Sequence, residues 1–326
     1  MNWKRSLKGH KNMQKRLLAV IVGPTAVGKT EIAIEVAQQI HAEIISADSM
    51  QIYRYMDIGT AKPSLEERKG IIHHMIDIID PDEEFSAADF QIGAKLHIQD
   101  IYKRHKIPLL TGGTGFYINT VCYNYTFSHA EKDDSFRKQL QSQAQQHGND
   151  YLYKKLDKLD PAAAKKIHPN NLRRVIRALE VCVKTGKPFS YYEEKTKKQQ
   201  SQYELLIYGL TRPREELYRR IDERVSSMLD DGLVNEVQKL LKMGYKRDLN
   251  SMQGLGYRQI IDYLYGEITM EEAVYLIARD TRHYAKRQYT WFLRDNNIIW
   301  LDVSKEGKKK IISKIIKDIE GKMKNT

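Results

Sequence analysis

Residues 23–30 of the chain read Gly-Pro-Thr-Ala-Val-Gly-Lys-Thr, which is the Gly-x-x-x-x-Gly-Lys-Thr pattern of a phosphate-binding loop, or P-loop. The two glycines of such a loop let successive backbone N–H groups point at one anion. We expect Lys29 to reach the phosphate oxygens, and the Thr30 hydroxyl is a candidate ligand for Mg²⁺ or for a phosphate oxygen. The predicted phosphate-binding residues are Gly23, Pro24, Thr25, Ala26, Val27, Gly28, Lys29 and Thr30.

The residues on either side of this loop have the pattern that a P-loop requires. Residues 18–22 are an apolar run typical of a buried strand, and residues 31–37 have the spacing of an amphipathic helix that begins near Lys29. The positive end of that helix would add to the attraction for an anion. The alternative is a glycine turn that binds nothing, which this context disfavours. We therefore predict that the protein binds a di- or triphosphate.

A second candidate for chemistry is Asp48, which follows a predicted strand over residues 42–47. A carboxylate at this point can accept a proton from a nucleophile while the P-loop holds the electrophile. The alternatives are a helix cap or a group that contacts Mg²⁺ through water. Another predicted strand, residues 107–111, ends in Thr111, where P-loop ATPases usually carry a metal-holding acid. The missing acid argues against ATP hydrolysis but not against phosphate binding.

These side chains need a parallel sheet to bring them together. Strand and helix patterns alternate from residue 18 to residue 123, and they include a helix over residues 87–102 with Ser86 as its N-cap. We therefore predict an α/β fold with a P-loop-containing parallel sheet flanked by helices. Ligands bind such sheets where the strands end, so the loops after three strands should converge. They cover residues 23–30, 48–51 and 111–115.

A predicted helix after Pro213 carries two arginines that suit a diphosphate. Its apolar stripe consists of Leu217, Ile221, Val225 and Met228, and Gly232 ends the helix. Arg220 and Arg224 lie four residues apart, so they share a face beside that stripe. Two guanidinium groups there can form a clamp for a diphosphate. Ion pairing with nearby acids is the alternative, and the acids are Glu216, Asp222 and Glu223.

The composition changes between about residues 126 and 202. This part is polar, rich in Gln and Lys, and without strand signals, so we interpret it as a smaller all-helical insertion domain. A predicted strand over residues 205–210 returns the chain to the core. The predicted P-loop core domain is thus made of residues 14–125 and 203–326, and it includes the basic helices at the C-terminus.

The chain is basic. Its 326 residues include 54 Lys and Arg against 42 Asp and Glu, which gives a net charge of +12. Residues 281–326 alone hold 12 basic and 5 acidic residues. Such an excess favours a polyanionic partner, although a solvated surface accounts for net charge about as well.

Compartment signals are few. The sequence has no apolar run near the ~20 residues that cross a bilayer and no secretory signal pattern. Its two cysteines, Cys122 and Cys182, lack metal-ligand spacing, which favours a reducing compartment. These features predict a cytoplasmic protein without a membrane segment.

Residues 279–291 interleave cations and aromatic rings on a predicted helix. Aromatic rings stack on unpaired bases and arginines bind phosphates, which is what recognition of single-stranded RNA needs. The aromatic residues can instead belong to the core, and for Trp291 we favour the core. A second basic helical face is predicted around Arg173, Arg174 and Arg177.

Six motifs occur in order along the chain: Gly-Pro-Thr-Ala-Val-Gly-Lys-Thr at 23–30, Asp-Ser-Met-Gln-Ile-Tyr at 48–53, Met-Asp-Ile-Gly-Thr-Ala-Lys-Pro at 56–63, Gly-Gly-Thr-Gly at 112–115, Arg-Ala-Leu-Glu at 177–180 and Ala-Lys-Arg-Gln-Tyr-Thr-Trp at 285–291. With them the chain resembles the bacterial tRNA dimethylallyltransferases, also called tRNA isopentenyltransferases. The resemblance extends from about Leu18 to Trp300. It departs from the eukaryotic members, which carry a C-terminal Cys/His zinc finger.

The resemblance implies that dimethylallyl diphosphate donates its five-carbon group to the exocyclic amine of the adenosine next to the tRNA anticodon, with Mg²⁺ as cofactor. It implies that Asp48 accepts a proton from the amine, and that Thr30 and Arg224 lie beside the bridging oxygen, where charge develops. Thr30 is also the implied metal ligand. The tRNA-contacting residues implied in the same way are Asp48, Ser49, Met50, Gln51, Thr114, Arg137, Arg173, Arg174, Arg177, Arg282, Lys286, Arg287 and Gln288.

The expected partners are the anticodon stem-loop of tRNA and dimethylallyl diphosphate, and no membrane or obligate protein partner is indicated. Three other functions share some of these features. A small-molecule kinase and a prenyltransferase for free adenine nucleotides both need a P-loop and a base, but neither needs the basic C-terminal part. A non-catalytic RNA-binding ATPase is disfavoured by the missing acid after Thr111 and by the placement of Asp48.

Overall fold

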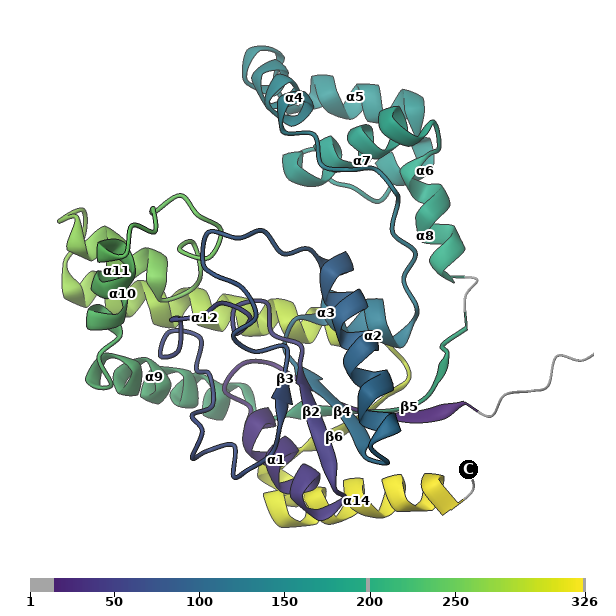
Figure 1. The fold of residues 1–326 in the computed structure, drawn as a ribbon. Coiled ribbons are helices and arrows are strands. Elements are labelled where there is room, and N and C mark those ends of the chain that lie inside the picture. The colour runs from purple at the N-terminus through teal and green to yellow at the C-terminus, as the bar shows by residue number, and fades with distance from the viewer. Residues whose placement is uncertain (1–14, 198–199, 325–326) are drawn as a thin grey trace, which may run out of the picture. The chain divides into compact units, whose positions relative to one another are not determined.

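The computed structural model describes residues 15–197 and 200–324. Its larger unit is built on a six-stranded sheet in the order β3-β2-β4-β1-β5-β6, and every pair of neighbours is parallel (Figure 1). The strands are β1 (Arg16–Val22), β2 (Ala42–Ser46), β3 (His73–His74), β4 (Ile107–Gly112), β5 (Tyr203–Thr211) and β6 (Ile298–Asp302). The predicted parallel α/β sheet is confirmed. The sequence patterns did not predict β3 and β6.

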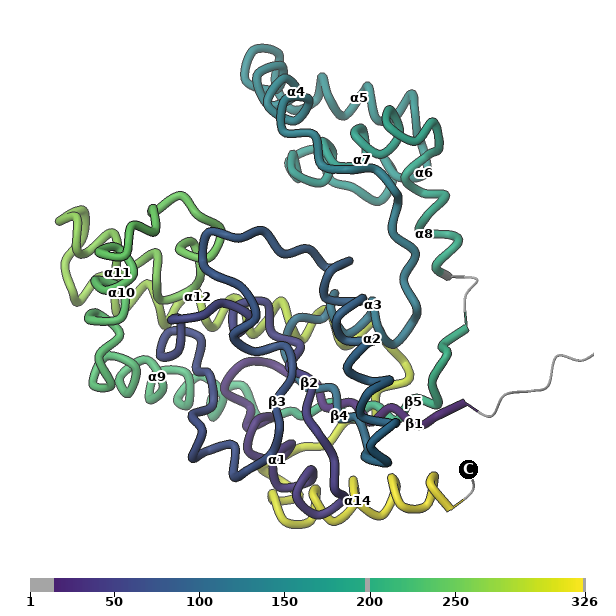
Figure 2. Tube along the Cα trace, viewed as in Figure 1, coloured from purple at the N-terminus to yellow at the C-terminus, as the bar shows by residue number. Residues whose placement is uncertain are grey.

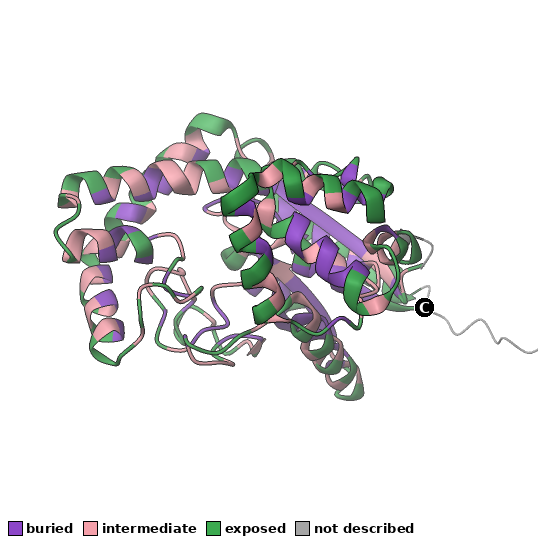
Figure 3. Cartoon of the chain, turned by 90° about the horizontal axis from the view of Figure 1, so that it is seen from above, coloured by how far each residue is buried: buried purple, intermediate pink, exposed green. Residues whose placement is uncertain are grey.

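The strand before the P-loop, β1, lies in the middle of the sheet. It pairs with β4 on one side and with β5 on the other, so that Ala19 is opposite both Leu109 and Leu206. Helices cover both faces, which explains why the strand is apolar at successive positions rather than at alternate ones. Figure 3 shows the buried strands between exposed helical surfaces.

The helices of the larger unit are α1 (Lys29–Gln39), α2 (Ala87–Lys103), α3 (Gly115–Cys122), α9 (Arg214–Asp230), α10 (Leu233–Lys242), α11 (Tyr257–Leu264), α12 (Met270–Phe292), α13 (Val303–Glu306) and α14 (Lys308–Lys324). As predicted, Ser86 caps α2, and its side chain and that of Asp89 form a reciprocal capping box. As also predicted, α9 buries an apolar stripe and ends before Gly232, whose φ of +97° is a conformation that glycine adopts easily.

The chain between β2 and α2 differs from the expected alternation of strands and helices. Apart from β3, this long segment is irregular, and Figure 2 shows its path beside the strand ends. Its backbone groups find partners without a helix; the amide of Ile78, for example, donates to the carbonyl of Ile52 at 2.8 Å. Lys62 is buried within it and forms ion pairs with Asp57 and Asp77, each at 2.5 Å. Charge pairing of this kind leaves no period for a sequence pattern to detect.

The smaller unit comprises Tyr123–Ser201 and has a core of its own. Its helices are α4 (Asp134–His147), α5 (Asn149–Leu159), α6 (Pro161–Ala164), α7 (Leu172–Thr185) and α8 (Phe189–Lys197). Leu152 and Leu156 of α5 pack with Val175 and Leu179 of α7 in this core. The described residues of the unit include no strand, as predicted for the insertion. The Gln-rich run in α4 is mostly exposed, with Leu140 and Ala144 facing inward and Gln143 partly buried.

Within the described ranges, no helix combines the length and the apolar character needed to span a membrane.

Candidate functional site

The three loops that the sequence predicted to converge meet at the carboxyl ends of β1, β2 and β4. The amide of Ala47, after β2, donates to the carbonyl of Thr111 at 2.7 Å, and the amide of Thr114 donates back to Ala47 at 3.1 Å. The amide of Ser49 then donates to the Thr114 hydroxyl at 3.0 Å. A Cβ at Gly112 would lie 2.2 Å from the carbonyl oxygen of Ala47, so only glycine allows the two strand ends to come this close.

The P-loop connects β1 to the first turn of α1. Gly28 caps the helix with a φ of +103°, and Lys29 begins it. The Lys29 ammonium group folds back and donates to the carbonyl of Pro24 at 2.7 Å. Burial, together with the guanidinium of Arg224, lowers the pKa of Lys29 to about 7, although Asp48 acts in the opposite direction. The negative charge near Lys29 is therefore too small to offset its burial and the charge of Arg224.

Three arginines contact the P-loop from outside. Arg212, which follows β5, donates to the carbonyl of Val27 at 3.0 Å, and Arg220 of α9 donates to that of Ala26 at 2.8 Å. One turn further along α9, Arg224 donates to the Thr25 hydroxyl at 3.3 Å. Neither Arg220 nor Arg224 forms an ion pair with a described residue, which removes the alternative of acid partners for both. No sequence motif indicated Arg212, because a single arginine after a strand carries no signal.

Two cavities adjoin these residues. The larger, of about 1190 Å³, lies between the P-loop, α9 and the segment around Lys62. The smaller, of about 620 Å³, is lined by residues after β2 and by α11 and α12. Seven residues line both cavities, and we call them the junction residues. They are Thr25, Asp48, Thr60, Ala61, Arg224, Met228 and Tyr284.

Asp48 is the only carboxylate among the junction residues. One of its oxygens accepts a hydrogen bond from the amide of Met50 at 2.9 Å, which fixes the side chain at the end of β2. The other oxygen accepts no hydrogen bond from a described residue. No helix of the described ranges begins directly after Asp48, so the helix-cap alternative does not apply; a local turn occupies one oxygen and leaves the second able to accept a proton.

The donor set near the P-loop suits Mg²⁺ that is bound together with a phosphate. The Thr30 hydroxyl and the Asp48 carboxylate line the larger cavity. In the part of the chain that the structure describes, no group of three or more His, Cys, Asp or Glu side chains could hold a metal ion. Mg²⁺ commonly takes one or two protein oxygens and completes its shell with water and substrate phosphates. The residues present fit that mode of binding.

Helix α12 supports the P-loop from the side of β4. The buried amide of Gln288 accepts a hydrogen bond from the Thr25 amide at 2.8 Å and donates to the carbonyl of Gly113 at 2.9 Å. Both polar atoms of this side chain are therefore used within the protein. The structure shows Gln288 joining two loops of the site, and the tRNA contact expected for this residue stays a prediction. Its sequence context alone could not reveal these partners.

The other residues predicted on α12 differ in accessibility. Lys286 and Arg287 are exposed, and the Arg287 guanidinium lies 5.7 Å from the ring centre of Tyr284. Arg282 forms an ion pair with Asp222 of α9 and lies over the ring of Tyr218. Two cations of the three are thus available to an outside partner.

The core assignment that the sequence favoured for Trp291 is wrong. Its side chain is 38% exposed and meets the ring of Phe116 edge to face. Phe292, the next residue, is buried in the core. The helical spacing places these neighbours on different faces, and Trp291 packs against Gly115, where a Cβ would lie 2.1 Å from the indole.

The residues after Asp48 also differ from one another. Ser49 and Met50 are partly exposed, whereas Gln51 is buried. The side-chain amide of Gln51 donates to the backbone carbonyls of Thr60 and Ala61 at 3.3 and 3.2 Å. Within this predicted tRNA-contacting stretch, Gln51 thus binds the backbone of another segment of the protein.

Four predicted tRNA contacts lie in the smaller unit. Arg137 and Arg177 both bind the buried carboxylate of Glu180, at 2.7 and 2.5 Å. Arg174 pairs with Glu193 at 3.1 Å, whereas Arg173 is exposed without an ion pair to a described residue. Glu180, the last residue of the Arg-Ala-Leu-Glu motif, therefore orients two of the arginines.

Comparison with known proteins assigns the family. The family model described as IPP transferase matches residues 51–295, and the model described as Isopentenyl transferase matches residues 16–79. The chain belongs to the IPP transferase family. The resemblance that its motifs indicated is thereby confirmed.

Bacterial relatives of this IPP transferase match almost throughout. The chain is 54% identical over 299 residues to the tRNA dimethylallyltransferase of Carboxydothermus hydrogenoformans, which covers 92% of the chain and 96% of the relative. It is 52% identical over 309 residues to that of Alkaliphilus metalliredigens, with 95% and 98% covered.

Solved structures agree with this assignment. The tRNA isopentenylpyrophosphate transferase of Bacillus halodurans has a TM-score of 0.72 at 44% identity, covering 96% of this chain and 98% of that one. A eukaryotic dimethylallyltransferase acting on tRNA has a TM-score of 0.76 at 32% identity, covering 88% of this chain and 74% of that one. The chain therefore shares the fold of solved tRNA isopentenyltransferases.

Proposed function

We propose that this IPP transferase moves a dimethylallyl group from dimethylallyl diphosphate to the exocyclic amine of the adenosine next to the anticodon of tRNA. The relatives' names support tRNA as the acceptor and the dimethylallyl group as the cargo. The roles proposed below for individual residues rest on the junction of the two cavities. There, Asp48 lies between the P-loop and the smaller cavity.

On the diphosphate side, the larger cavity offers the P-loop amides, the ammonium group of Lys29 and the guanidinium of Arg224. As the carbon–oxygen bond of the allylic diphosphate breaks, its electron pair passes to the bridging oxygen. Arg224 and the Thr30 hydroxyl would stabilise the charge that develops there. Arg220 and Arg212 hold the loop by its carbonyls, which keeps its amides directed toward the anion.

Mg²⁺ is proposed as the cofactor, with Thr30 as its protein ligand. Such an ion would neutralise part of the diphosphate charge and so favour departure of the leaving group.

On the acceptor side, the smaller cavity is where the adenine would lie. The amine nitrogen forms the new bond to the allylic carbon, and the proton it loses goes to the open oxygen of Asp48. Because an adenine amine is a weak nucleophile, holding it against the allylic carbon supplies much of the rate enhancement. Extraction of a base from the anticodon loop costs a few kcal/mol at most, since that base is unpaired.

The tRNA would lie on the exposed cations of α12, Lys286 and Arg287, and on the residues after Asp48. Arg173 of the smaller unit is the most available of the remaining predicted contacts. A cytoplasmic location follows as a proposal from the tRNA substrate and from two buried cysteines that form no disulfide.

The decisive experiment compares Asp48→Asn with the unchanged protein, using radiolabelled dimethylallyl diphosphate, Mg²⁺ and unmodified tRNA. Asparagine keeps the oxygen that accepts the Met50 amide but cannot accept the proton. We expect kcat to fall by about 10²–10⁴-fold while the affinity for tRNA is retained. Asp82→Asn, an exposed aspartate outside both cavities, is the matched control.

Three results would contradict the proposal. Full activity of Asp48→Asn would remove Asp48 as the base. Label found on free AMP and never on tRNA would favour the nucleotide prenyltransferase, and consumption of ATP without prenyl transfer would favour the kinase.

A further inference from the structure

The junction between the two cavities must hold the group that is transferred. If the diphosphate lies in the larger cavity and the acceptor amine in the smaller, the allylic carbons have to cross the boundary that the junction residues form. Most of those residues are polar. Ala61 and Met228 are the two aliphatic side chains among them, and they line both cavities.

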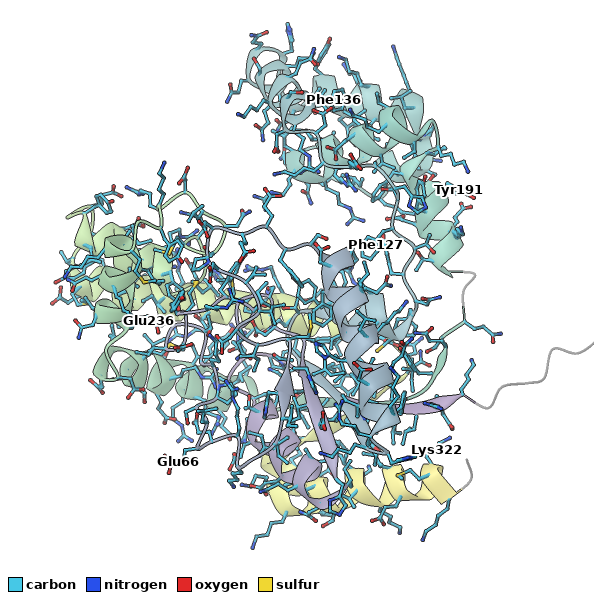
Figure 4. All side chains as sticks on the ribbon, in the orientation of Figure 1. Glu66, Phe127, Phe136, Tyr191, Glu236 and Lys322 are labelled. Carbon is cyan, nitrogen blue, oxygen red and sulfur yellow. The ribbon has the colours of Figure 1, made fainter. Side chains whose placement is uncertain are left out.

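The segment that carries Ala61 is held in place from one side by Glu236 of α10, which is labelled in Figure 4. Its carboxylate accepts the backbone amides of Asp57, Ile58 and Gly59 at 2.9, 2.8 and 3.1 Å. The hydroxyl of Tyr257 donates to the same carboxylate at 2.6 Å. A Cβ at Gly59 would lie 2.5 Å from the Tyr257 ring, so the segment cannot move toward α11.

From the other side, the segment is held by Gln51, whose amide reaches the carbonyls of Thr60 and Ala61. The Ala61 amide donates to Ile58 at 2.9 Å, which closes a tight turn. Five successive residues, 57–61, are therefore fixed by side chains from outside the segment. Ala61 has a φ of +48°, a conformation that every residue with a Cβ adopts at a cost and that glycine adopts easily.

Met228 approaches the junction from α9. It lies one helical turn after Arg224, and both residues are partly buried. Its unbranched thioether fits an irregular apolar ligand well. The junction thus combines an immobile small side chain with an adaptable one, beside the arginine that contacts the P-loop.

We propose that Ala61 and Met228 form the seat of the prenyl group and select it by its methyl groups. This inference rests on the proposed function. Both side chains are apolar, so their substitution should affect the hydrocarbon part of the donor far more than the binding of the diphosphate or of the tRNA.

The test measures kcat/KM for dimethylallyl diphosphate and for crotyl diphosphate, which has one methyl group fewer. Taking the ratio removes the intrinsic reactivity of each donor when variants are compared. Met228→Ala and Ala61→Gly should lower the preference for the dimethylallyl donor by about 10-fold, the usual value of one buried methyl group. Glycine at position 61 keeps the positive φ, so this variant should fold.

The controls separate the seat from the rest of the site. Inhibition by inorganic diphosphate and binding of tRNA should stay unchanged in both variants. Leu229→Ala, a truncation at the next position of α9 that lines neither cavity, should leave the donor preference as it is.

An unaltered preference in both variants would overturn the proposal, and so would an equal change in Leu229→Ala. If the unchanged protein transferred no prenyl group to tRNA at all, the proposed function itself would fail. The two failures are therefore distinguishable.

Discussion

Lys29 is the residue whose chemistry depends most on its surroundings. Burial and the nearby Arg224 bring its pKa to about 7, so the ammonium group is only about half protonated at neutral pH in the free protein. Its pKa lies below that of the unfolded chain. The cost to stability is therefore full below about pH 7 and disappears as the pH rises from about 7 to about 10.5.

Binding of an anion should reverse this. We expect inorganic diphosphate to draw a proton onto Lys29, with an uptake that approaches about one proton near pH 8.5. Calorimetry in buffers of different ionisation enthalpy measures this uptake directly. Lys29→Gln should abolish it, whereas Lys305→Gln, an exposed lysine on α13, should not. Because diphosphate itself titrates in this pH range, the difference between the two proteins is decisive: the same proton balance in Lys29→Gln and in the unchanged protein would show that Lys29 takes up no proton on binding.

At this scale the sequence predicted the residues that belong to motifs and missed those that act from a distance. The P-loop and Asp48 follow from local patterns. Glu236 and Gln288 do not, because their partners lie far away along the chain and a single Glu or Gln on a helix has no periodic signal. For Arg137 and Arg177, the sequence indicated the charge but not the buried Glu180 that binds it.

Among the elements, α12 has two functions on two faces. Its buried Gln288 connects the P-loop to the loop after β4, and its exposed Lys286 and Arg287 offer charge to an outside partner. One straight helix therefore joins the candidate RNA surface to the phosphate site.

Gln288→Leu should test this connection. The change leaves the Thr25 amide and the Gly113 carbonyl without partners, which should cost about 2 kcal/mol of stability and raise the KM for the diphosphate substrate. Denaturant unfolding and steady-state kinetics measure the two effects. Gln288→Glu should restore part of the KM, because a carboxylate still accepts the Thr25 amide.

The control for a purely structural effect is Gln91→Leu in α2. Gln91 is also buried, and its amide donates to the carbonyl of Thr120 at 2.6 Å. We expect a loss of stability with an unchanged KM. Equal KM values for both leucine variants would mean that Gln288 has no special role in the site.

Elements were predictable where a period or a cap was present. The apolar run of β1, the capping residue of α2 and the stripe of α9 all led to the observed elements. The two-residue β3 is too short for a pattern, and β6 follows an irregular segment. The position of the Trp291 side chain could not be predicted, because it packs against Gly115. This contact arises only where α12 packs on α3.

For the whole molecule, the positive charge is the main feature, and part of it serves the fold. Lys308 at the start of α14 pairs with Glu31 and Glu35 of α1, and Lys322 near its end pairs with Glu204 of β5. The excess counted in the C-terminal sequence is thus larger than the charge available to RNA.

The double variant Lys286→Ala with Arg287→Ala should show whether these two residues supply the positive charge that is available to RNA. If both side chains contact phosphates, the slope of log affinity for tRNA against log salt should become less steep by about 1.4 units, since each contact to a single strand contributes about 0.7. The matched control is Lys309→Ala with Lys310→Ala, which removes the same charge from an exposed part of α14. Equal slopes for the two double variants would show only a general effect of net charge.

The position of the insertion in the chain has a consequence for how the protein is made. β1 pairs with β4, which precedes the smaller unit, and with β5, which follows it. During synthesis, one edge of β1 therefore stays unpaired until the ribosome has added the whole inserted unit and Tyr203 has emerged. An open apolar strand edge is a site for misassembly, and long-range pairing is slow. The smaller unit has its own core, so we expect it to fold during this interval and to shorten the distance that β5 must search.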